Sequence, residues 1–294
     1  MKFNIVQIVD KSNVSHLVHD PIRLLLYTLE DLGHDVILSK NNFSKDRINI
    51  VVIGARLTDQ NVDALIASRI PYVVYQTEIF SDQGLNYQSN FANCMDIQDV
   101  YIKLVRHAIM NWEIFDFNQQ YLQQLGIESH ILHHGYHPLL EGRPKKETQD
   151  IDVAFFGTMT LYRQKILKEL VKQGISMMVL EHDGPLFRDE ILRRSKINLS
   201  IRSNDTNMAH LPPIRVMTGL YNHTMTVSDE IRGQHWMGNM FDFVEPALIV
   251  SRLQELLASQ EYTTLAQQYR NEFLRYPMED CMRPLLVELS GRVS

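Results

Sequence analysis

Three strand-like runs in the second half of the sequence each end in residue types that bind ligands. In an open parallel sheet the carboxyl ends of the strands meet at one edge, and ligands bind in the crevice outside that edge. Backbone N–H groups and guanidinium groups both donate hydrogen bonds and favour negative charge, so both suit an anion. The residues that follow the three runs are Gly157-Thr158, Arg202 and Asp229-Glu230. We therefore expect one ligand site, with anion-binding groups, built by these loops.

The elements that must hold these residues alternate between strands and helices, as in an α/β fold. Short apolar runs alternate with stretches whose apolar residues recur at helical spacing, which predicts βαβ units and parallel sheets. The strands expected on this basis are residues 3–9, 36–38, 49–54, 71–76, 112–117, 129–134, 151–156, 175–180, 197–201, 225–227 and 241–244. The helices expected between them are residues 19–32, 55–68, 99–110, 118–125, 163–173, 187–195, 214–221, 247–259, 263–275 and 278–289. The pattern starts afresh at Ile151, which indicates a second domain.

The domain boundaries follow from length and local composition. A chain of 294 residues is long enough for two domains of ordinary size. The best boundary is the polar segment 144–149, which begins with a proline and is rich in charge. We expect an N-terminal domain over residues 1–140 and a C-terminal domain over residues 150–275. Residues 276–294 are expected to form a terminal helix that could cross back to the N-terminal domain.

Charge, cysteine content and hydropathy narrow the class of protein. The net charge of −6 gives no general attraction for nucleic acid or for anionic membranes. Cys94 and Cys281 are far apart and in no metal or redox spacing, which favours a reducing compartment. The first residues do not read as a signal peptide, and no apolar run is long enough for a transmembrane helix. We therefore expect a cytoplasmic location.

Four stretches of the sequence resemble a known family of enzymes. They are Asp152–Gly157, with the sequence D-V-A-F-F-G, Tyr162-Arg163, Arg215-Val216-Met217 and Ile131–Pro138. They resemble the C-terminal half, and the segment before it, of GT-B glycosyltransferases of the group-1-like set, which includes spore-maturation-type glycosyltransferases. The resemblance covers mainly residues 151–258, and the first half of the chain shares only the rhythm of its elements. One departure is Met217, which stands where the family commonly has an acidic residue that binds the ribose.

The resemblance implies a GT-B-like α/β fold, with two Rossmann-type parallel-sheet domains that face a cleft. It also implies transfer of a sugar from a nucleotide-sugar donor, with the nucleotide sugar as substrate and no cofactor. The acceptor could be a carbohydrate, a lipid-linked molecule or a protein. No metal would be required, because arginines and backbone amides would hold the diphosphate leaving group. The residues implied in donor binding are Gly157, Thr158, Arg163, Arg202, His210, Arg215, Asp229 and Glu230.

An enzyme that inverts the configuration of the sugar also needs a base for the acceptor hydroxyl. We expect this base in the N-terminal domain, at a strand end facing the ligand. Glu78 follows the expected strand at residues 71–76 and is the first choice; Asp20, His16 and Asp10 are further candidates. The alternative to a catalytic role is that Glu78 caps a helix or lies on the surface. A retaining enzyme needs no such base, and the sequence does not choose between the two outcomes.

Neighbouring histidines could also indicate a metal site. His133 and His134 are adjacent on an expected strand, and His130 and His137 flank them. Adjacent strand residues point to opposite faces, and no cysteine or aspartate completes a ligand set. We therefore expect these histidines to line the segment between the two domains without binding a metal.

Other interpretations of the sequence stay open beside glycosyl transfer. The main one is a GT-B-like nucleotide-binding or scaffold protein without catalytic activity, and Met217 motivates it. A two-lobed binding protein of the periplasmic type is disfavoured, because no signal sequence is recognised. Glucosylation of DNA belongs to the first class of activity, but the acidic net charge argues against a nucleic-acid partner. A homodimer is one assembly that the chain could form.

Overall fold

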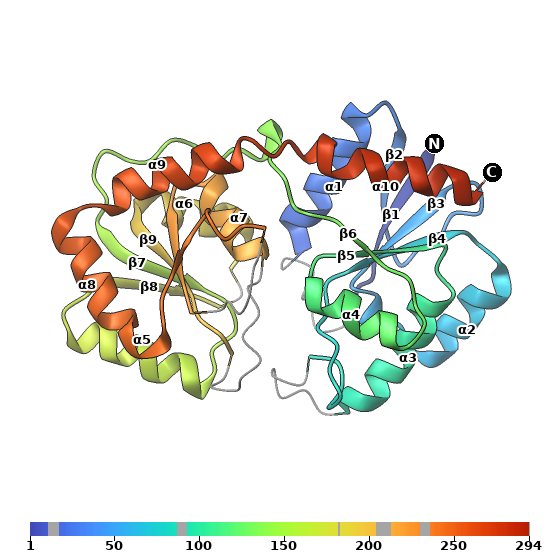
Figure 1. The fold of residues 1–294 in the computed structure, drawn as a ribbon, viewed down its shortest axis with the longest axis horizontal. Coiled ribbons are helices and arrows are strands. Elements are labelled where there is room, and N and C mark those ends of the chain that lie inside the picture. Colours follow the sequence, from blue (N-terminus) through green and yellow to red (C-terminus); the bar gives the residue numbers. More distant parts are fainter. Residues whose placement is uncertain (11–17, 87–92, 182, 204–212, 230–235, 294) are drawn as a thin grey trace. The chain divides into compact units, whose positions relative to one another are not determined.

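The computed structural model describes residues 1–10, 18–86, 93–181, 183–203, 213–229 and 236–293 (Figure 1). The chain divides into two compact units, and each is described by itself. Unit 1 comprises Met1–His137 and Pro277–Ser294, and unit 2 comprises Pro138–Tyr276. The segment 144–149 belongs to unit 2. Within the described residues, the helices are too short or too polar to cross a membrane.

Unit 1 contains a six-stranded parallel sheet with the strand order β2-β1-β3-β4-β5-β6. The strands are β1 (Lys2–Gln7), β2 (Asp35–Lys40), β3 (Ile48–Val52), β4 (Tyr72–Gln76), β5 (Met110–Glu113) and β6 (His130–Ile131). The helices are α1 (His19–Asp31), α2 (Asp59–Ser68), α3 (Cys94–Arg106), α4 (Asp116–Gln124) and α10 (Met278–Val293). The strand order reverses between β1 and β3, so their carboxyl ends form the switch point at which such sheets bind ligands.

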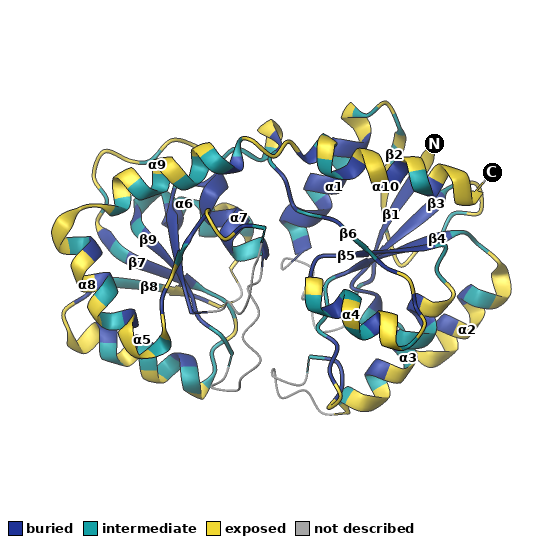
Figure 2. Ribbon diagram, viewed as in Figure 1, coloured by how far each residue is buried: buried dark blue, intermediate teal, exposed yellow. Residues whose placement is uncertain are grey.

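Helices cover both faces of the unit 1 sheet. In Figure 1, α1 and α10 lie on one face, and α2, α3 and α4 lie on the other. The central strands β3 and β4 are buried along their whole lengths (Figure 2), as expected for apolar strands with both faces covered. Val51 and Val74 from these strands form one core cluster with Leu65 of α2 and Leu104 of α3.

The connection from β2 to β3 contains no helix. Residues 41–47 pass over β1 as an extended chain, whereas a crossover between parallel strands usually takes a dozen or more residues. Two buried asparagines hold this chain in place of helical packing. Asn49 Nδ2 donates to the Ser44 carbonyl oxygen (2.8 Å), and Asn4 Nδ2 donates to the Asn42 carbonyl oxygen (2.9 Å). An extended crossover is thinner than a helix, which leaves space beside α2.

Unit 2 contains a five-stranded parallel sheet with the strand order β11-β10-β9-β7-β8. The strands are β7 (Ile151–Phe156), β8 (Met177–Leu180), β9 (Ser195–Ser200), β10 (Met225–Ser228) and β11 (Asp242–Phe243). The helices are α5 (Leu161–Lys172), α6 (Pro185–Arg194), α7 (Pro213–Tyr221), α8 (Ile249–Ser259) and α9 (Tyr262–Phe273). The three central strands are β10, β9 and β7, so their carboxyl ends lie next to one another.

The core of unit 2 fixes which helices lie on which face. Phe155 and Leu199 from the strands form one cluster with Leu167 of α5 and Leu253 of α8. On the opposite face, Ala154 belongs to a second cluster with residues of α6. The alternation of side chains along β7 therefore separates the α5–α8 layer from the α6 layer.

Most of the expected elements are present within a few residues of their predicted bounds. The expected strand over residues 112–117 is too long, because β5 ends at Glu113. The side chain of Glu113 accepts hydrogen bonds from the backbone N–H groups of Ile114 (2.8 Å) and Phe115 (3.0 Å), which turns the chain into α4. The terminal helix continues through Pro284 as far as Val293.

Helix α7 approaches the sheet closely at Gly219. A Cβ at this residue would lie 2.5 Å from Thr226 Oγ1 and 2.9 Å from the carbonyl oxygen of Thr224. Asn198 Nδ2 donates to the carbonyl oxygen of Arg215 (3.2 Å) and to Thr226 Oγ1 (3.0 Å). These contacts of Gly219 and Asn198 therefore set the position of α7 and of Arg215, which lies on it.

We predict that Gly219→Ala destabilises the protein by about 1–3 kcal/mol, because overpacking a tight contact forces backbone shifts. Urea denaturation followed by circular dichroism measures the change. Gly291→Ala is the matched control, since it also lies in a helix but nothing is within 4 Å of a Cβ there. Equal stability of the two variants would show that α7 does not need this close approach.

Candidate functional site

Arginines from two helices meet over one aromatic ring at the carboxyl edge of the unit 2 sheet. Arg163 lies in the first turn of α5, where Thr160 caps the helix by accepting a hydrogen bond from the Arg163 backbone N–H (3.3 Å). The Arg163 side chain is buried, and its guanidinium carbon lies 5.5 Å from the centre of the Phe155 ring. The guanidinium carbon of Arg215, on α7, lies 5.9 Å from the same ring centre. Phe155 thus supports two cations at the end of β7.

The carbonyl oxygen of Ile201, just after β9, accepts hydrogen bonds from both of these arginines. Arg163 Nη2 lies 2.7 Å from this oxygen, and Arg215 Nη1 lies 3.2 Å from it. Arg163 also donates to the carbonyl oxygens of Arg202 (3.1 Å) and Thr158 (2.6 Å). Like charges held this closely repel each other, and an anion bound beside them offsets the repulsion. The geometry therefore suits a negatively charged ligand.

The turn after β7 requires glycine at position 157. Gly157 has a φ of +139°, which residues with a side chain rarely adopt. A Cβ there would lie 2.6 Å from Arg215 Nη2 and 3.6 Å from Arg163 Nη1. The Gly157 N–H donates to the Leu180 carbonyl oxygen (2.9 Å), while the Thr158 N–H has no partner among the described residues. Gly157 thus makes room for the guanidinium groups, and Thr158 offers an amide donor beside them.

Asp229, at the end of β10, fixes the direction of Arg202. Its Oδ1 accepts a hydrogen bond from the Arg202 backbone N–H (2.7 Å), and its Oδ2 accepts one from Arg202 Nε (3.1 Å). The hydroxyl of Tyr162, on α5, donates to the same Oδ2 (3.2 Å). Burial raises the pKa of the Asp229 carboxyl, and the hydrogen bonds from Arg202 and Tyr162 oppose that shift. The pair joins the end of β9 to the end of β10.

The structure gathers six of the eight expected donor-site residues at this one edge. They are Gly157, Thr158, Arg163, Arg202, Arg215 and Asp229. The other two, His210 and Glu230, lie outside the described residues. Met217 is fully buried on α7 and belongs to the interior of the unit. Phe155 and Tyr162 were not among the expected donor-site residues, although both stand in motifs that carry the family resemblance, Asp152–Gly157 and Tyr162-Arg163.

In unit 1, Glu78 lies in a hydrogen-bonded turn directly after β4. Its Oε1 accepts a hydrogen bond from the Thr77 hydroxyl (3.0 Å), and its Oε2 accepts one from the side-chain amide of Asn86. Its backbone carbonyl oxygen accepts a hydrogen bond from Asn118 Nδ2 (2.7 Å). The residue is half-buried, so the carboxylate is held in one orientation while part of it stays accessible.

The other expected bases lie on different elements of unit 1. Asp20 is in the first turn of α1 and is nearly buried, with its Oδ1 3.5 Å from His19 Nδ1. Asp10 follows β1 and pairs with Arg56, whose Nη1 lies 3.4 Å from Asp10 Oδ2. His16 lies outside the described residues.

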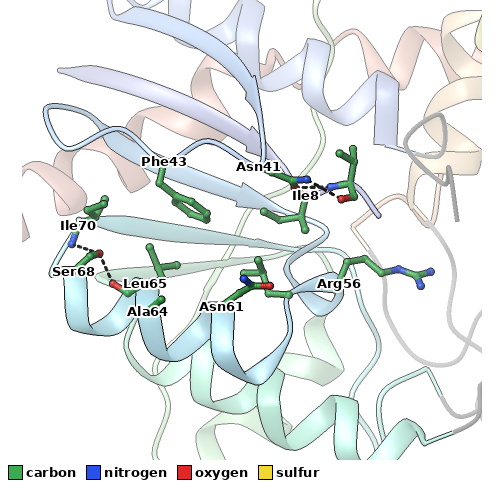
Figure 3. Close-up of a pocket in the computed structure, with 11 residues that line it drawn as sticks. Ile8, Asn41, Phe43, Arg56, Asn61, Ala64, Leu65, Ser68 and Ile70 are labelled. Carbon is green, nitrogen blue, oxygen red and sulfur yellow. Dashed lines mark hydrogen bonds between the residues drawn. The ribbon is translucent and has the colours of Figure 1, made fainter. Parts of the chain in front are cut away.

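A pocket of about 410 Å³ lies in unit 1 between the β2–β3 crossover and α2 (Figure 3). Ile8 and Arg56 are two of the residues that line it. They follow β1 and β3, respectively, at the switch point of the sheet. Phe43 and Leu65 point into it, and Arg56 extends outward at one end (Figure 3). Ile53, three residues before Arg56 in the sequence, has a φ of 60°, which is an unusual conformation for a β-branched residue. The pocket has the size and the mainly apolar lining of a site for a small organic group.

A second carboxyl group, that of Glu113, is buried at the end of β5. Glu113 lies opposite Gln76 of β4 in the sheet register. Among the described residues, Glu113 Oε2 and Gln76 Nε2 have no hydrogen-bond partner. Burial raises the pKa of Glu113 well above its ordinary value, although the amides of Ile114 and Phe115 oppose the shift. Burial thus favours the protonated form of this carboxyl.

One group of side chains within the described residues has the donor types of a metal site. It consists of Glu128, His130 and Glu288, whose ligand atoms lie within 4.8 Å of one another. Arg292 Nη2 donates to Glu128 Oε2 (2.7 Å) and to Glu288 Oε1 (2.5 Å), and lies 3.2 Å from His130 Nε2. The guanidinium of Arg292 already provides the positive charge that a metal ion would bring to these groups. Its contacts also tie α10 to the end of the unit 1 sheet.

Two parallel-sheet α/β units define a class of fold, and comparison with solved structures specifies it. An alpha-glucosyltransferase in complex with UDP and a 13-mer DNA containing a HMU base is similar, with a TM-score of 0.65, 12% identity and 99% of each chain covered. The lipopolysaccharide outer core galactosyltransferase WaaB has a TM-score of 0.52 at 9% identity, covering 98% of this chain and 99% of WaaB. AviGT4, a glycosyltransferase involved in Avilamycin A biosynthesis, has a TM-score of 0.54 at 10% identity, covering 98% of this chain and 97% of AviGT4.

These similarities show that the chain has the GT-B fold, with two Rossmann-type units. The fold expected from the motifs is therefore confirmed. By sequence, the chain matches no protein-family model and no curated protein. At 9–12% identity, the likeness to these three structures establishes the architecture.

The raised pKa of Glu113 predicts a specific dependence of stability on pH. Between the unfolded and the folded pKa, this residue is ionised in the unfolded chain and protonated in the folded one. Stability then falls as the pH rises above the unfolded value, by up to about 1.4 kcal/mol per pH unit from this one group. Glu113→Gln keeps the acceptor for Ile114 and Phe115 and removes the titration, so its melting temperature should fall less between pH 5 and pH 8.

Thermal unfolding at these two pH values checks this expectation. Glu279→Gln is the control, because Glu279 is a partly exposed residue that pairs with Arg283 on α10. The same pH dependence in wild type and Glu113→Gln would contradict burial of a protonated carboxyl at the end of β5.

Proposed function

We propose that this protein is a glycosyltransferase that moves a sugar from a nucleotide-sugar donor to an acceptor. The observation that carries the proposal is the gathering of Arg163, Arg202 and Arg215 at the carboxyl edge of unit 2. The GT-B fold supports it, since the similar structures include a glucosyltransferase in complex with UDP. In this proposal unit 2 binds the donor and unit 1 binds the acceptor.

The arginines of unit 2 are proposed to stabilise the diphosphate leaving group. When the bond from the sugar to the diphosphate breaks, negative charge develops on the leaving oxygen. Fixed guanidinium groups and the Thr158 amide, next to the N-terminus of α5, would stabilise that charge without reorganising. Transfer would then require no metal ion and no cofactor. Asp229 is proposed to act by orienting Arg202, with the Tyr162 hydroxyl as its second partner.

Unit 1 is proposed to hold the acceptor and, for transfer with inversion, the base. Glu78 is the first choice, because both of its carboxylate oxygens are held and the residue is only half-buried. As a base it would take the proton of the acceptor hydroxyl while the hydroxyl oxygen attacks the sugar carbon. Asp20 and His16 are the alternatives for this role.

The acceptor is proposed to be a carbohydrate, a lipid-linked molecule or a protein, bound at unit 1. The pocket beside α2 is lined mainly by apolar side chains. One similar structure is a complex with DNA. A net charge of −6 opposes a polyanionic acceptor for this chain, because nucleic-acid binding depends on neutralising phosphates. The chain is proposed to act in the cytoplasm.

A second candidate is a nucleotide-binding protein of the same fold without turnover. Met217 favours it, since this residue is fully buried and places no carboxylate at the site from α7. Binding of a nucleotide together with the absence of any sugar transfer or donor hydrolysis would select this candidate.

We predict that a nucleoside diphosphate raises the melting temperature and that Arg202→Ala removes the shift. A ligand at one hundred times its Kd contributes about 2.7 kcal/mol to stability, which is several degrees for units of this size. Differential scanning with uridine, guanosine, cytidine and thymidine diphosphates measures the effect and ranks the bases. If none of the four shifts the wild-type melting temperature, the proposed donor site is wrong.

Arg194→Ala is the matched control for this experiment. Arg194 also pairs with an aspartate, Asp150, but it lies at the end of α6, just before the amino end of β9. It should lower the melting temperature somewhat and keep the nucleotide shift. Loss of the shift in both variants would mean that the effect reports general destabilisation rather than binding at the carboxyl edge.

A further inference from the structure

A second pocket in unit 2, of about 210 Å³, lies at the opposite edge of the sheet from the arginine site. Lys196 is the second residue of β9, Gln149 comes shortly before β7, and His223 comes shortly before β10. These positions place the pocket at the amino ends of the three central strands. Residues of α9 and of the segment 144–149 complete its walls.

Basic side chains line this pocket, but burial lowers the pKa of His223 and lowers the pKa of Lys145 to about 7, so the positive charge of the pocket comes mainly from Lys196 and Arg270. These four are its basic residues, and none of the described residues that line it is acidic. Carboxylates lie behind three of these basic groups: Asp152 accepts from Lys196 Nζ (2.6 Å), and Glu141 Oε1 accepts from Arg270 Nη2 (2.6 Å) and lies 2.9 Å from His223 Nε2. Such pairing orients the cations while leaving other donors for a ligand.

The remaining donors on these cations can reach a ligand. Arg270 uses Nε and Nη2 on Glu141, and its Nη1 has no partner among the described residues. Lys196 Nζ makes one hydrogen bond to a described residue, so two of its three N–H groups remain. Helix α9 starts at Tyr262 in the pocket wall, and the side chain of its N-cap, Glu261, makes no capping hydrogen bond. The positive end of this 12-residue helix thus lies at the pocket wall, with the carboxylate of Glu261 beside it as a counter-charge.

Lys145 has no N–H group left for a ligand and acts on the pocket only through the charge of its protonated form. Its Nζ donates to the carbonyl oxygens of Leu192 (2.7 Å) and Ser195 and to Thr224 Oγ1 (2.8 Å), which uses all three N–H groups. Burial lowers the pKa of Lys145 to about 7. A buried ammonium beside other cations is costly, and an anion in the pocket offsets that cost.

We propose that this pocket binds a phosphate group, either as free inorganic phosphate or as part of a small phosphorylated molecule. Arg270 Nη1 and Lys196 Nζ are its direct donors, and the protonated form of Lys145 adds positive charge beside them. The volume admits a phosphate with a few further atoms and is too small for a nucleotide sugar. The site is separate from the arginine site and does not depend on the proposed glycosyl transfer. Its ligand would join the segment 144–149 to β9 and α9.

Titration of the full chain with inorganic phosphate at constant ionic strength tests the proposal. We expect a saturable rise in melting temperature for wild type and for Arg202→Ala, which alters only the other site. Arg270→Gln and Lys196→Gln should each weaken phosphate binding by about tenfold or more, the usual effect of losing a hydrogen bond to a charged group. Arg275→Gln is the matched control, because Arg275 is exposed, pairs with Glu272 and lies outside the pocket. A parallel titration with glycerol 3-phosphate distinguishes a phosphorylated molecule from the free ion by its tighter or weaker binding.

Hydrogen exchange on the wild-type chain keeps the test independent of how the variants fold. Phosphate should slow exchange in residues 144–149 and 260–270, whether or not it also slows exchange in residues 157–163 at the arginine edge. The proposal is overturned if phosphate has no saturable effect on wild type. It is also overturned if protection appears only at residues 157–163, or if Arg202→Ala abolishes the effect while Arg270→Gln and Lys196→Gln keep it.

Discussion

Two guanidinium groups share one carbonyl oxygen at the end of β9, and the carboxyl edge of unit 2 is organised around that arrangement. Arg163 and Arg215 both donate to Ile201, and both lie over the ring of Phe155. Two like charges this close are unfavourable in a partly buried place unless dipoles and opposite charges surround them. Carbonyl oxygens at the ends of β7 and β9 supply the dipoles. An anionic ligand would supply the opposite charge, which links the stability of this edge to binding.

The neighbouring elements serve this arrangement in different ways. Gly157 has no side chain, so the guanidinium of Arg215 can lie directly against the turn. Gly219 lets α7 approach β10 closely enough to bring Arg215 to the edge. Asp229 turns Arg202 toward the same edge and is itself held by Tyr162. These are long-range contacts between segments far apart in the sequence, and the parallel sheet is what brings them together.

Local pattern was sufficient to predict most of the elements and the edge of the sheet at which the candidate site residues meet. Apolar runs such as Ile151–Phe156 fixed the strands, and the polar residues after them marked the carboxyl ends. The roles of single side chains were not predictable in the same way. Nothing in the local sequence shows that Arg163 donates to three carbonyl oxygens or that Glu113 is fully buried. Both facts depend on tertiary packing, as does the pocket left by a crossover that lacks a helix.

In the proposed reaction a nucleotide sugar loses its nucleoside diphosphate at the arginine edge of unit 2. The most direct measurement is the release of nucleoside diphosphate from a panel of sugar nucleotides, with water and simple glycosides as acceptors. We expect release from at least one donor, and a fall of about 10²-fold or more in Arg215→Gln, the usual cost of removing one donor that stabilises developing charge. Release from no donor, or an unchanged rate in Arg215→Gln, would contradict the account.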